Sequence, residues 1–397
     1  MTSGLVVVSL EPWDDVWRRN QYLVAGLLRA DPGLRVLFVE PPSDPLHDLR
    51  HSRQPRWSRG TRPAAPIDGV APGRVLTLRP TKALPRRVDP GGDRRRATAI
   101  VRAARRLGLE SPTLWINDLV GVDLLDLTDW PALYDVTDDW LAADRSPAEH
   151  DRLVAAEARV LSEAAVVTVC SPALARAKGA DRPVTLVSNG VDVARYARPV
   201  ARPADLPAGP CAVYLGTLHG DRLDVALCRR TAEHLGSGAT LVLVGPSALA
   251  EDDEAVLRRS GVVLLGARPH RAVPAYLQHA DALVVPHVVD AFTDSLDPIK
   301  LYEYRAVGRP VVSTPVAGFR DSDDPRVTSV DAAGFPAAVA AAVRRPLPAR
   351  PVPGDLPTWS AQAEAMAAAL ATARDSRASY SSADGDTSRN GRQAGFG

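Results

Sequence analysis

Short apolar runs alternate with longer amphipathic stretches along most of this chain, and the alternation constrains its fold more than any other feature. Buried strands that are separated by helices are typical of parallel sheets with helices on both faces. We therefore predict an α/β protein. The predicted strands cover residues 5–9, 35–39, 75–78, 113–117, 132–136, 165–170, 184–188, 212–216, 240–245, 262–266, 282–286 and 310–314.

The alternation falls into two blocks with a proline-rich segment between them. The predicted helices cover residues 16–29, 94–107, 149–163, 222–235, 251–260, 271–279, 298–307 and 359–372. Four prolines and little apolar periodicity mark residues 198–210 as a linker. At roughly 150 residues per domain, the length also favours two domains. We expect domains at 1–197 and 211–357, a final helix at 358–375 and a disordered tail, rich in Ser and Gly, at 376–397.

Two such units suggest Rossmann-like domains that face an interdomain cleft, with ligands at the carboxyl ends of the strands. The loop after the first strand, residues 11–15, has no GxGxxG motif, which argues against an NAD or FAD enzyme. Polar side chains follow several strands, and a catalytic carboxylate, if there is one, is expected among them. These residues are Asp14, Asp118 and Asp138, with Asp15, Asn117 and Asp139 beside them. A turn or capping role is the alternative for each.

The charges exclude one class of partner. The 48 basic residues nearly balance the 47 acidic ones, so no global electrostatic attraction favours nucleic acid. Residues 50–106, however, hold 16 basic residues against three acidic ones, and prolines up to residue 90 forbid a long helix. We expect a basic loop here. It is either a solvated Arg-rich surface or a site that docks on an anionic membrane or steers a phosphate-bearing acceptor.

The three cysteines lie far apart without zinc-site spacing, and we expect no metal site. The apolar run at residues 5–8 is too short for a signal peptide or a membrane span, and no other window approaches 18 apolar residues. These observations predict a cytoplasmic enzyme, with peripheral association at the inner face of the membrane as a further option.

Only three of the 48 basic residues are lysines, and Lys300 is the one that follows a predicted helix start. Asp297 fits the N-cap and Pro298 the first helical position, where free N–H groups attract phosphate. Lys300 and Glu303 are three residues apart and so share a helix face. An ammonium can neutralise diphosphate oxygens, and a carboxylate can accept hydrogen bonds from two ribose hydroxyls. The pair suits a nucleotide diphosphate. An ordinary i,i+3 salt bridge on a solvated helix is the alternative.

A second stretch, residues 216–222, follows a predicted strand and opens a helix. Gly216 allows a ligand to approach the backbone closely, and Arg222 can reach a phosphate. A plain strand-to-helix turn is the alternative. His287 also follows a strand, and we expect it to face the bound nucleotide or to cap the strand rather than to catalyse.

Residues 297–312 resemble the nucleotide-binding segment of GT-B-fold glycosyltransferases, in the branch that reads Pro-x-Lys-x-Tyr-Glu-Tyr and then Gly-x-Pro-Val-Val. Within that branch, which is family-4-like, the run is most similar to bacterial teichuronic-acid or capsule-type enzymes. Other matching pieces lie in the family's order at residues 17–21, 39–42, 134–140, 189–192 and 214–218.

The resemblance implies a GT-B fold whose final helix crosses back to the N-terminal domain. By position, Glu303 resembles the ribose-binding glutamate, Lys300 the phosphate-side lysine, and the stretch with Gly216, Thr217 and Arg222 the diphosphate loop. Ser295 stands where the broader pattern has an acid, and Asp294 and Asp297 are the neighbours that could replace it.

The implied enzyme is a glycosyltransferase of the EC 2.4 class that needs no metal or other cofactor. It would bind a nucleotide-sugar donor in the C-terminal domain, with a UDP-sugar as the expected donor, and a hydroxyl acceptor in the N-terminal domain. The reaction would retain the anomeric configuration. Cell-surface glycan or secondary-metabolite glycoside synthesis is the expected role. A GT-B-fold sugar-nucleotide epimerase and a non-catalytic GT-B partner subunit are the alternatives.

Overall fold

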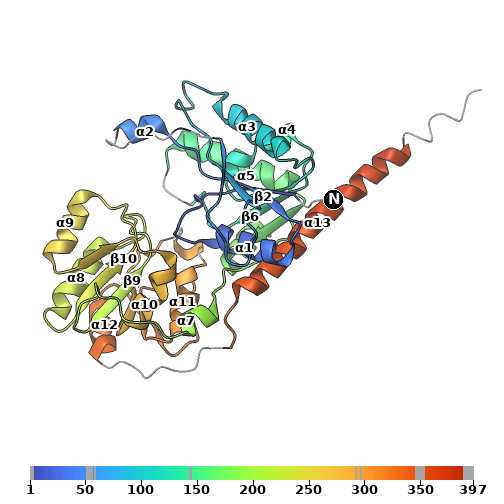
Figure 1. Cartoon of the computed structure of the whole chain (residues 1–397). Coiled ribbons are helices and arrows are strands. Elements are labelled where there is room, and N and C mark those ends of the chain that lie inside the picture. The colour runs from blue at the N-terminus through green and yellow to red at the C-terminus, as the bar shows by residue number, and fades with distance from the viewer. Residues whose placement is uncertain are drawn as a thin grey trace, which may run out of the picture. The chain divides into compact units, whose positions relative to one another are not determined.

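A computed structural model describes residues 4–50, 57, 60–142, 145–290, 293–295, 297–344 and 354–387 (Figure 1). The chain folds as two units. Met1–Val187 and Ser360–Gly397 form the N-terminal unit, and Ser188–Trp359 form the C-terminal unit.

The described part of the N-terminal unit is built on an eight-stranded sheet of order β3-β4-β2-β1-β5-β6-β7-β8. Every neighbouring pair is parallel except β3 and β4. The strands are β1 Gly4–Val8, β2 Arg35–Val39, β3 Thr61–Pro63, β4 Val75–Leu78, β5 Thr113–Ile116, β6 Ala132–Val136, β7 Val166–Val169 and β8 Thr185–Leu186. The helices are α1 Arg19–Ala30, α2 Pro45–Arg50, α3 Gly92–Arg106, η1 Leu119–Gly121, α4 Leu124–Leu127, α5 Pro147–Glu163, α6 Pro172–Lys178 and α13 Trp359–Thr387.

The described part of the C-terminal unit has a six-stranded, wholly parallel sheet of order β11-β10-β9-β12-β13-β14. The strands are β9 Cys211–Leu215, β10 Thr240–Val244, β11 Val263–Gly266, β12 Ala282–Val285, β13 Val311–Ser313 and β14 Val327–Ser329. The helices are α7 Val193–Ala197, α8 Val225–Leu235, α9 Glu251–Arg259, η2 His270–Ala272, α10 Val273–Gln278, η3 Thr293–Ser295, α11 Ile299–Val307 and α12 Phe335–Arg344.

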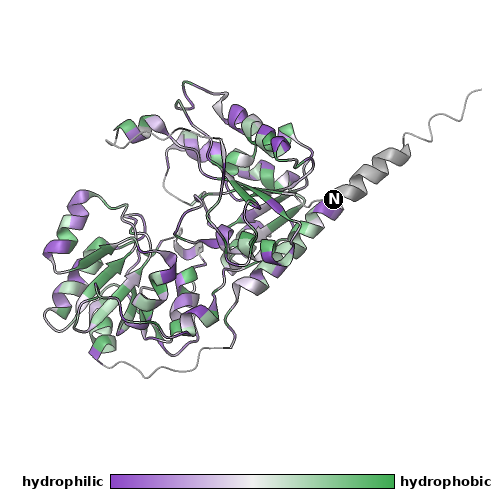
Figure 2. Cartoon of the chain, viewed as in Figure 1, coloured by the Kyte–Doolittle hydropathy of each residue, from purple (hydrophilic) through white to green (hydrophobic). Residues whose placement is uncertain are grey.

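Apolar residues fill the strands of both sheets (Figure 2). In β9, alternate side chains point to opposite faces, so Val213 packs with α10 and α11 while Tyr214 packs with α8 and α12. Both faces of this sheet are therefore covered, as the continuous apolar runs predicted. The α/β fold class is confirmed.

Two strands and several helices were not predicted. β3 and β14 lie at the edges of their sheets, and polar side chains and a proline give β3 no strand pattern. The helix α12 did carry a signal, since Phe335, Val339 and Val343 recur at four-residue spacing and are buried.

The expected linker at residues 198–210 was wrong, because this segment packs within the C-terminal unit. Leu206 is buried, the Val200 N–H donates to Oε1 of Gln278 at 3.1 Å, and Arg202 donates to the carbonyl of His279. Prolines prevent a helix here, but they do not prevent packing.

The final helix packs on the N-terminal unit, so the chain returns there after the C-terminal unit. Met366 and Leu370 of α13 are buried, and Nε of Arg374 donates to Oγ1 of Thr113 at 2.7 Å. Because α13 continues to Thr387, the disorder that was expected from residue 376 does not begin there. Residues 388–397 lie outside the described residues.

No helix within the described ranges is long and apolar enough to span a membrane.

Candidate functional site

Candidate site residues gather at the carboxyl edges of the two sheets, and each unit is described by itself. In the C-terminal unit, Gly216 directly follows β9 and Gly245 directly follows β10, both with positive φ (145° and 149°). A Cβ on Gly245 would collide with the carbonyl oxygen of Gly216. The two strand ends therefore approach so closely that only glycine fits at position 245.

The helix that carries Lys300 and Glu303, α11, begins after Pro298 and not after Asp297 as predicted. The carboxylate of Asp297 accepts hydrogen bonds from the Asn189 N–H (2.5 Å) and from the Tyr302 hydroxyl (2.6 Å). Asp297 thus ties the loop at Asn189 to α11, and its carboxylate is not available to cap the helix.

Lys300 lies over the end of β9. Its Nζ donates to Oη of Tyr214 at 3.3 Å and stands 4.9 Å from the centre of the Tyr214 ring. A Cβ on Gly216 would lie 3.1 Å from this Nζ, so the missing side chain makes room for the ammonium. Burial, together with the charge of Arg222, lowers the pKa of Lys300 to about 8. A bound anion would stabilise the charged form.

Tyr214 is itself held by His287, whose Nε2 lies 3.1 Å from Oη of Tyr214. His287 is buried, and burial lowers its pKa well below the usual range, so the ring is neutral. Because Lys300 donates to the tyrosine oxygen, the tyrosine proton is available for the histidine nitrogen. His287 thus lies behind Tyr214 in a supporting position.

Glu303 is also held by a tyrosine. Its Oε1 accepts a hydrogen bond of 2.5 Å from the Tyr196 hydroxyl, and only 9% of the residue is exposed. Burial raises the pKa of Glu303 to about 7, while Tyr196 and Lys300 act in the opposite direction.

The salt-bridge alternative for Lys300 and Glu303 fails. The described residues provide no ion pair to Lys300, whereas the other two lysines are paired, Lys82 with Asp44 and Lys178 with Glu157. Lys300 and Glu303 are instead each bonded to a buried tyrosine.

Arg222 belongs to the same site. Its carbonyl accepts a hydrogen bond from the Val288 N–H, which fixes it beside the end of β12, and its charge lowers the pKa of Lys300 and of His287. Thr217 follows Gly216 and is half-buried. The structure therefore brings the five predicted donor-binding residues together at one sheet edge.

Neither acidic neighbour of Ser295 has a free carboxylate. Asp297 is bonded as above, and Asp294 forms an ion pair of 2.9 Å with Arg320.

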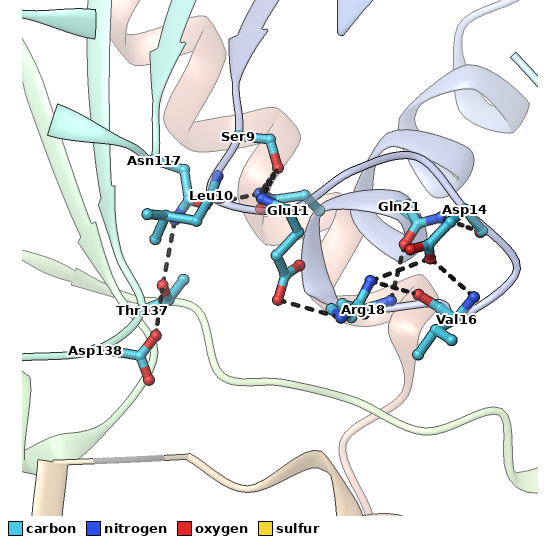
Figure 3. A network of polar contacts seen from close by, with 11 residues as sticks. Ser9, Leu10, Glu11, Asp14, Val16, Arg18, Gln21, Asn117, Thr137 and Asp138 are labelled. Carbon is cyan, nitrogen blue, oxygen red and sulfur yellow. Dashed lines mark hydrogen bonds and ion pairs between the residues drawn. The ribbon is translucent and has the colours of Figure 1, made fainter. Parts of the chain in front are cut away.

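In the N-terminal unit, a polar network joins the ends of β1, β5 and β6 (Figure 3). Oδ1 of Asn117 accepts hydrogen bonds from Asn20 (2.7 Å) and from the Leu10 N–H (3.3 Å). Its Nδ2 donates to the carbonyl of Asp135 and to Oγ1 of Thr137. Asn117 thus fixes the loops in which the predicted carboxylates lie.

The three predicted catalytic carboxylates are all engaged. Asp14 accepts from the Val16 N–H at 2.9 Å and from Arg18 at 3.1 Å, and Asp138 accepts from Thr137 at 3.3 Å (Figure 3). Asp118 accepts from the Val120 N–H at 3.0 Å and caps η1, in agreement with its capping alternative.

Glu11 was missed as a site residue. Its Oε1 lies 3.7 Å from Nε of Arg18, and just over a third of its side chain is exposed (Figure 3). Burial, with Asp138 and Asp14 nearby, raises the pKa of Glu11 to about 7 against the opposing charge of Arg18. Its place directly after the first strand was the available signal.

Much of the basic segment has a structural role. Arg62 and Arg79 pair with the buried Glu40, at 2.7 and 3.2 Å, and Arg74 donates to main-chain carbonyls. Trp57 and Val88 are more than 60% exposed. Within the described part of the chain, no group of acidic, His or Cys side chains could hold a metal ion.

Residues 209–347 match the family described as glycosyl transferases group 1. TuaH of Bacillus subtilis (strain 168), named as a teichuronic acid biosynthesis glycosyltransferase, is 29% identical over 210 residues. That alignment covers 48% of this chain and 52% of TuaH, so the chain spans about half the length of this curated relative.

Solved structures resemble nearly the whole chain. HepE of Anabaena, in complex with UDP and glucose, has a TM-score of 0.58 at 14% identity and covers 96% of this chain and 100% of its own. The catalytic domain of starch synthase IV of Arabidopsis thaliana, bound to ADP and acarbose, has a TM-score of 0.56 at 13% identity and covers 94% of this chain and 99% of its own. The chain thus has the GT-B fold, and its residues 209–347 match the model of the group 1 glycosyltransferases.

Proposed function

We propose that this protein transfers a sugar from a nucleotide diphosphate to a hydroxyl acceptor. The observation that carries the proposal is the placement of Lys300 and Glu303 on one helix, with the ammonium against Gly216 and neither side chain paired with the other. A cation and a carboxylate so placed suit the diphosphate and the ribose of one donor.

In this proposal, Lys300 and Arg222 stabilise the charge that develops on the diphosphate as it leaves the sugar. Glu303 accepts hydrogen bonds from the ribose, while Gly216 and Thr217 let the backbone approach the phosphates. These side chains supply the positive charge from the protein itself, so we propose a reaction that requires no divalent metal.

UDP is the first nucleotide to test, because HepE is known in complex with UDP and UDP-glucose. We assign the acceptor to the N-terminal unit, where Glu11, Asp14 and Asp138 lie at the sheet edge and can accept hydrogen bonds from a hydroxyl. Asp118 stays in this set with the reservation that its carboxylate caps η1. We also propose retention of anomeric configuration, as the family resemblance implies, and a role in cell-surface glycan synthesis, as the name of TuaH suggests.

Nucleotide binding tests the proposal. UDP and UDP-glucose should bind the wild type in calorimetry, and Lys300→Ala and Glu303→Ala should each lose binding while thermal melting shows them folded. Unchanged affinity in both variants would remove this site. Conversion of UDP-glucose to an epimeric UDP-sugar without any acceptor would instead support the epimerase alternative.

We further propose that the exposed part of the basic segment docks on anionic lipid, with Trp57 and Val88 as its apolar contacts. Co-sedimentation with phosphatidylglycerol vesicles at low salt should show binding that is lost with neutral vesicles. No binding to either kind of vesicle would reject the membrane role.

A further inference from the structure

We propose that Tyr196 is a positioning residue for the donor: its hydroxyl favours the charged form of the Glu303 carboxylate and turns it toward the ligand. This inference rests on the proposed function, and it concerns a residue that lies in α7, far from α11 in the sequence. Neither the helix-start pattern nor the family resemblance pointed to it.

The contact between Tyr196 and Glu303 is short and rigidly held. Tyr196 is 2% exposed, and its Oη lies 2.5 Å from Oε1 of Glu303 across 107 residues of sequence. The carbonyl of Tyr196 accepts a hydrogen bond of 2.8 Å from Gln278, and the carboxylate of Asp192 caps α7 at the Arg195 N–H. Both ends of the tyrosine are therefore fixed, and its hydroxyl can direct the carboxylate.

The hydrogen bond uses one of the two carboxylate oxygens. No second hydrogen bond to Glu303 comes from the described ranges of the chain, so Oε2 is left to accept from a ligand. A carboxylate with one oxygen held by the protein can offer the other in a fixed direction, which reduces the entropy lost on binding.

The charged groups around Glu303 explain why the hydroxyl is needed. Arg195 of α7 and Lys300 of α11 favour the carboxylate, burial opposes it, and the neighbouring Tyr304 is neutral because its own pKa is well above the usual range. The tyrosine proton stabilises the charged form, so the pKa of Glu303 stays near 7. Without that hydroxyl we expect the carboxyl group to be protonated at neutral pH and to be a poorer acceptor.

The test is the pH dependence of UDP-glucose binding by calorimetry, from about pH 6 to 9. The diphosphate diester does not titrate in this range, so the acid limb of the profile reports Glu303, whereas the alkaline limb reports Lys300 together with the uracil N–H of the ligand. Tyr196→Phe should move the acid limb to higher pH and weaken binding about tenfold at pH 7, with the alkaline limb unchanged.

Tyr134→Phe is the matched control. The Tyr134 hydroxyl also donates to a buried carboxylate, that of Glu157 at 3.0 Å, but in the N-terminal unit. The pH profile of UDP-glucose binding by Tyr134→Phe should superimpose on that of the wild type, although Tyr134→Phe and Tyr196→Phe each lose one buried hydrogen bond.

Three results would overturn the inference: an unmoved acid limb in Tyr196→Phe, an equal loss of affinity at every pH, or an equal shift in the control. If Tyr196→Phe does not fold, Tyr196→Met, which also lacks the hydroxyl, takes its place, and its acid limb must move to higher pH in the same way. If the wild type does not bind UDP-glucose at all, the proposed donor fails and the inference fails with it.

Discussion

Nζ of Lys300 lies 3.3 Å from Oη of Tyr214 and 4.9 Å from the centre of the same ring, so one buried tyrosine contacts the ammonium with both its hydroxyl and its π face. His287 holds the other side of that hydroxyl. The position of the Lys300 ammonium is therefore set by Tyr214 of β9 and by His287 after β12, and not by α11 alone.

Removing the Tyr214 hydroxyl should weaken binding of diphosphates in particular. Tyr214→Phe keeps the ring but loses a hydrogen bond to a charged group, which contributes about 1.5 kcal/mol and corresponds to roughly tenfold in affinity. We expect this loss for UDP in calorimetry. Uridine, which lacks phosphates, should bind the variant and the wild type alike. An equal loss for both ligands would show that the hydroxyl does not act through Lys300.

Gly245→Ala should destabilise the C-terminal unit severely. The new Cβ would collide with the carbonyl oxygen of Gly216, and φ at this position is 149°. We expect a loss of about 3 kcal/mol or more in the free energy of unfolding, measured by denaturant titration. Gly261→Ala is the control, because φ is also positive (83°) but no atom lies within 4 Å. It should cost about 1 kcal/mol.

Glu303 should make stability fall as the pH rises. In the unfolded chain its pKa is near 4.5, and in the folded protein it is about 7. The folded state therefore binds this proton more tightly, so the contribution of Glu303 to stability is most favourable below pH 4.5, becomes less favourable from there to pH 7 and stays low above it. Glu303→Gln removes this penalty and should be more stable at pH 8 by up to about 3 kcal/mol. Parallel pH–stability curves for both proteins would contradict the shifted pKa.

Arg19 should be essential to the N-terminal unit. Its guanidinium makes two hydrogen bonds of 3.0 Å to the carboxylate of Asp135, and both residues are buried. Arg19→Met leaves that carboxylate without its partner and should cost about 3–5 kcal/mol in denaturant unfolding. Arg159→Met breaks a more exposed pair with Asp126 and should cost less than about 1 kcal/mol. Similar costs for the two variants would show that burial does not set the difference.

The strand-helix alternation was enough to predict both sheets, and with them the sheet edge at which ligands bind. Lys300 and Glu303 were predicted because their signal is local: a helix start, a spacing of three residues and a rare lysine. Such a signal lies within a few residues of sequence and does not depend on how the rest of the chain packs.

The supporting residues could not be predicted in this way. Tyr196 meets Glu303 across 107 residues and Tyr214 meets Lys300 across 86, and only the packed unit brings them together. The segment 198–210 could not be assigned from sequence for the same reason. Several prolines are compatible both with a free linker and with an extended segment that packs on α10. Asp297 was a reasonable N-cap by residue type, but Asn189 and Tyr302 compete for its carboxylate.

The return of the chain to the N-terminal unit at Ser360 has a consequence for how the protein is made. The C-terminal unit is one uninterrupted segment, whereas the N-terminal unit includes α13, which is synthesised after the C-terminal unit. Because domains fold as units during synthesis, the C-terminal unit can be complete on the ribosome while the N-terminal unit still lacks its last helix. A chain truncated before α13 should therefore retain nucleotide binding, whereas its N-terminal unit should be destabilised.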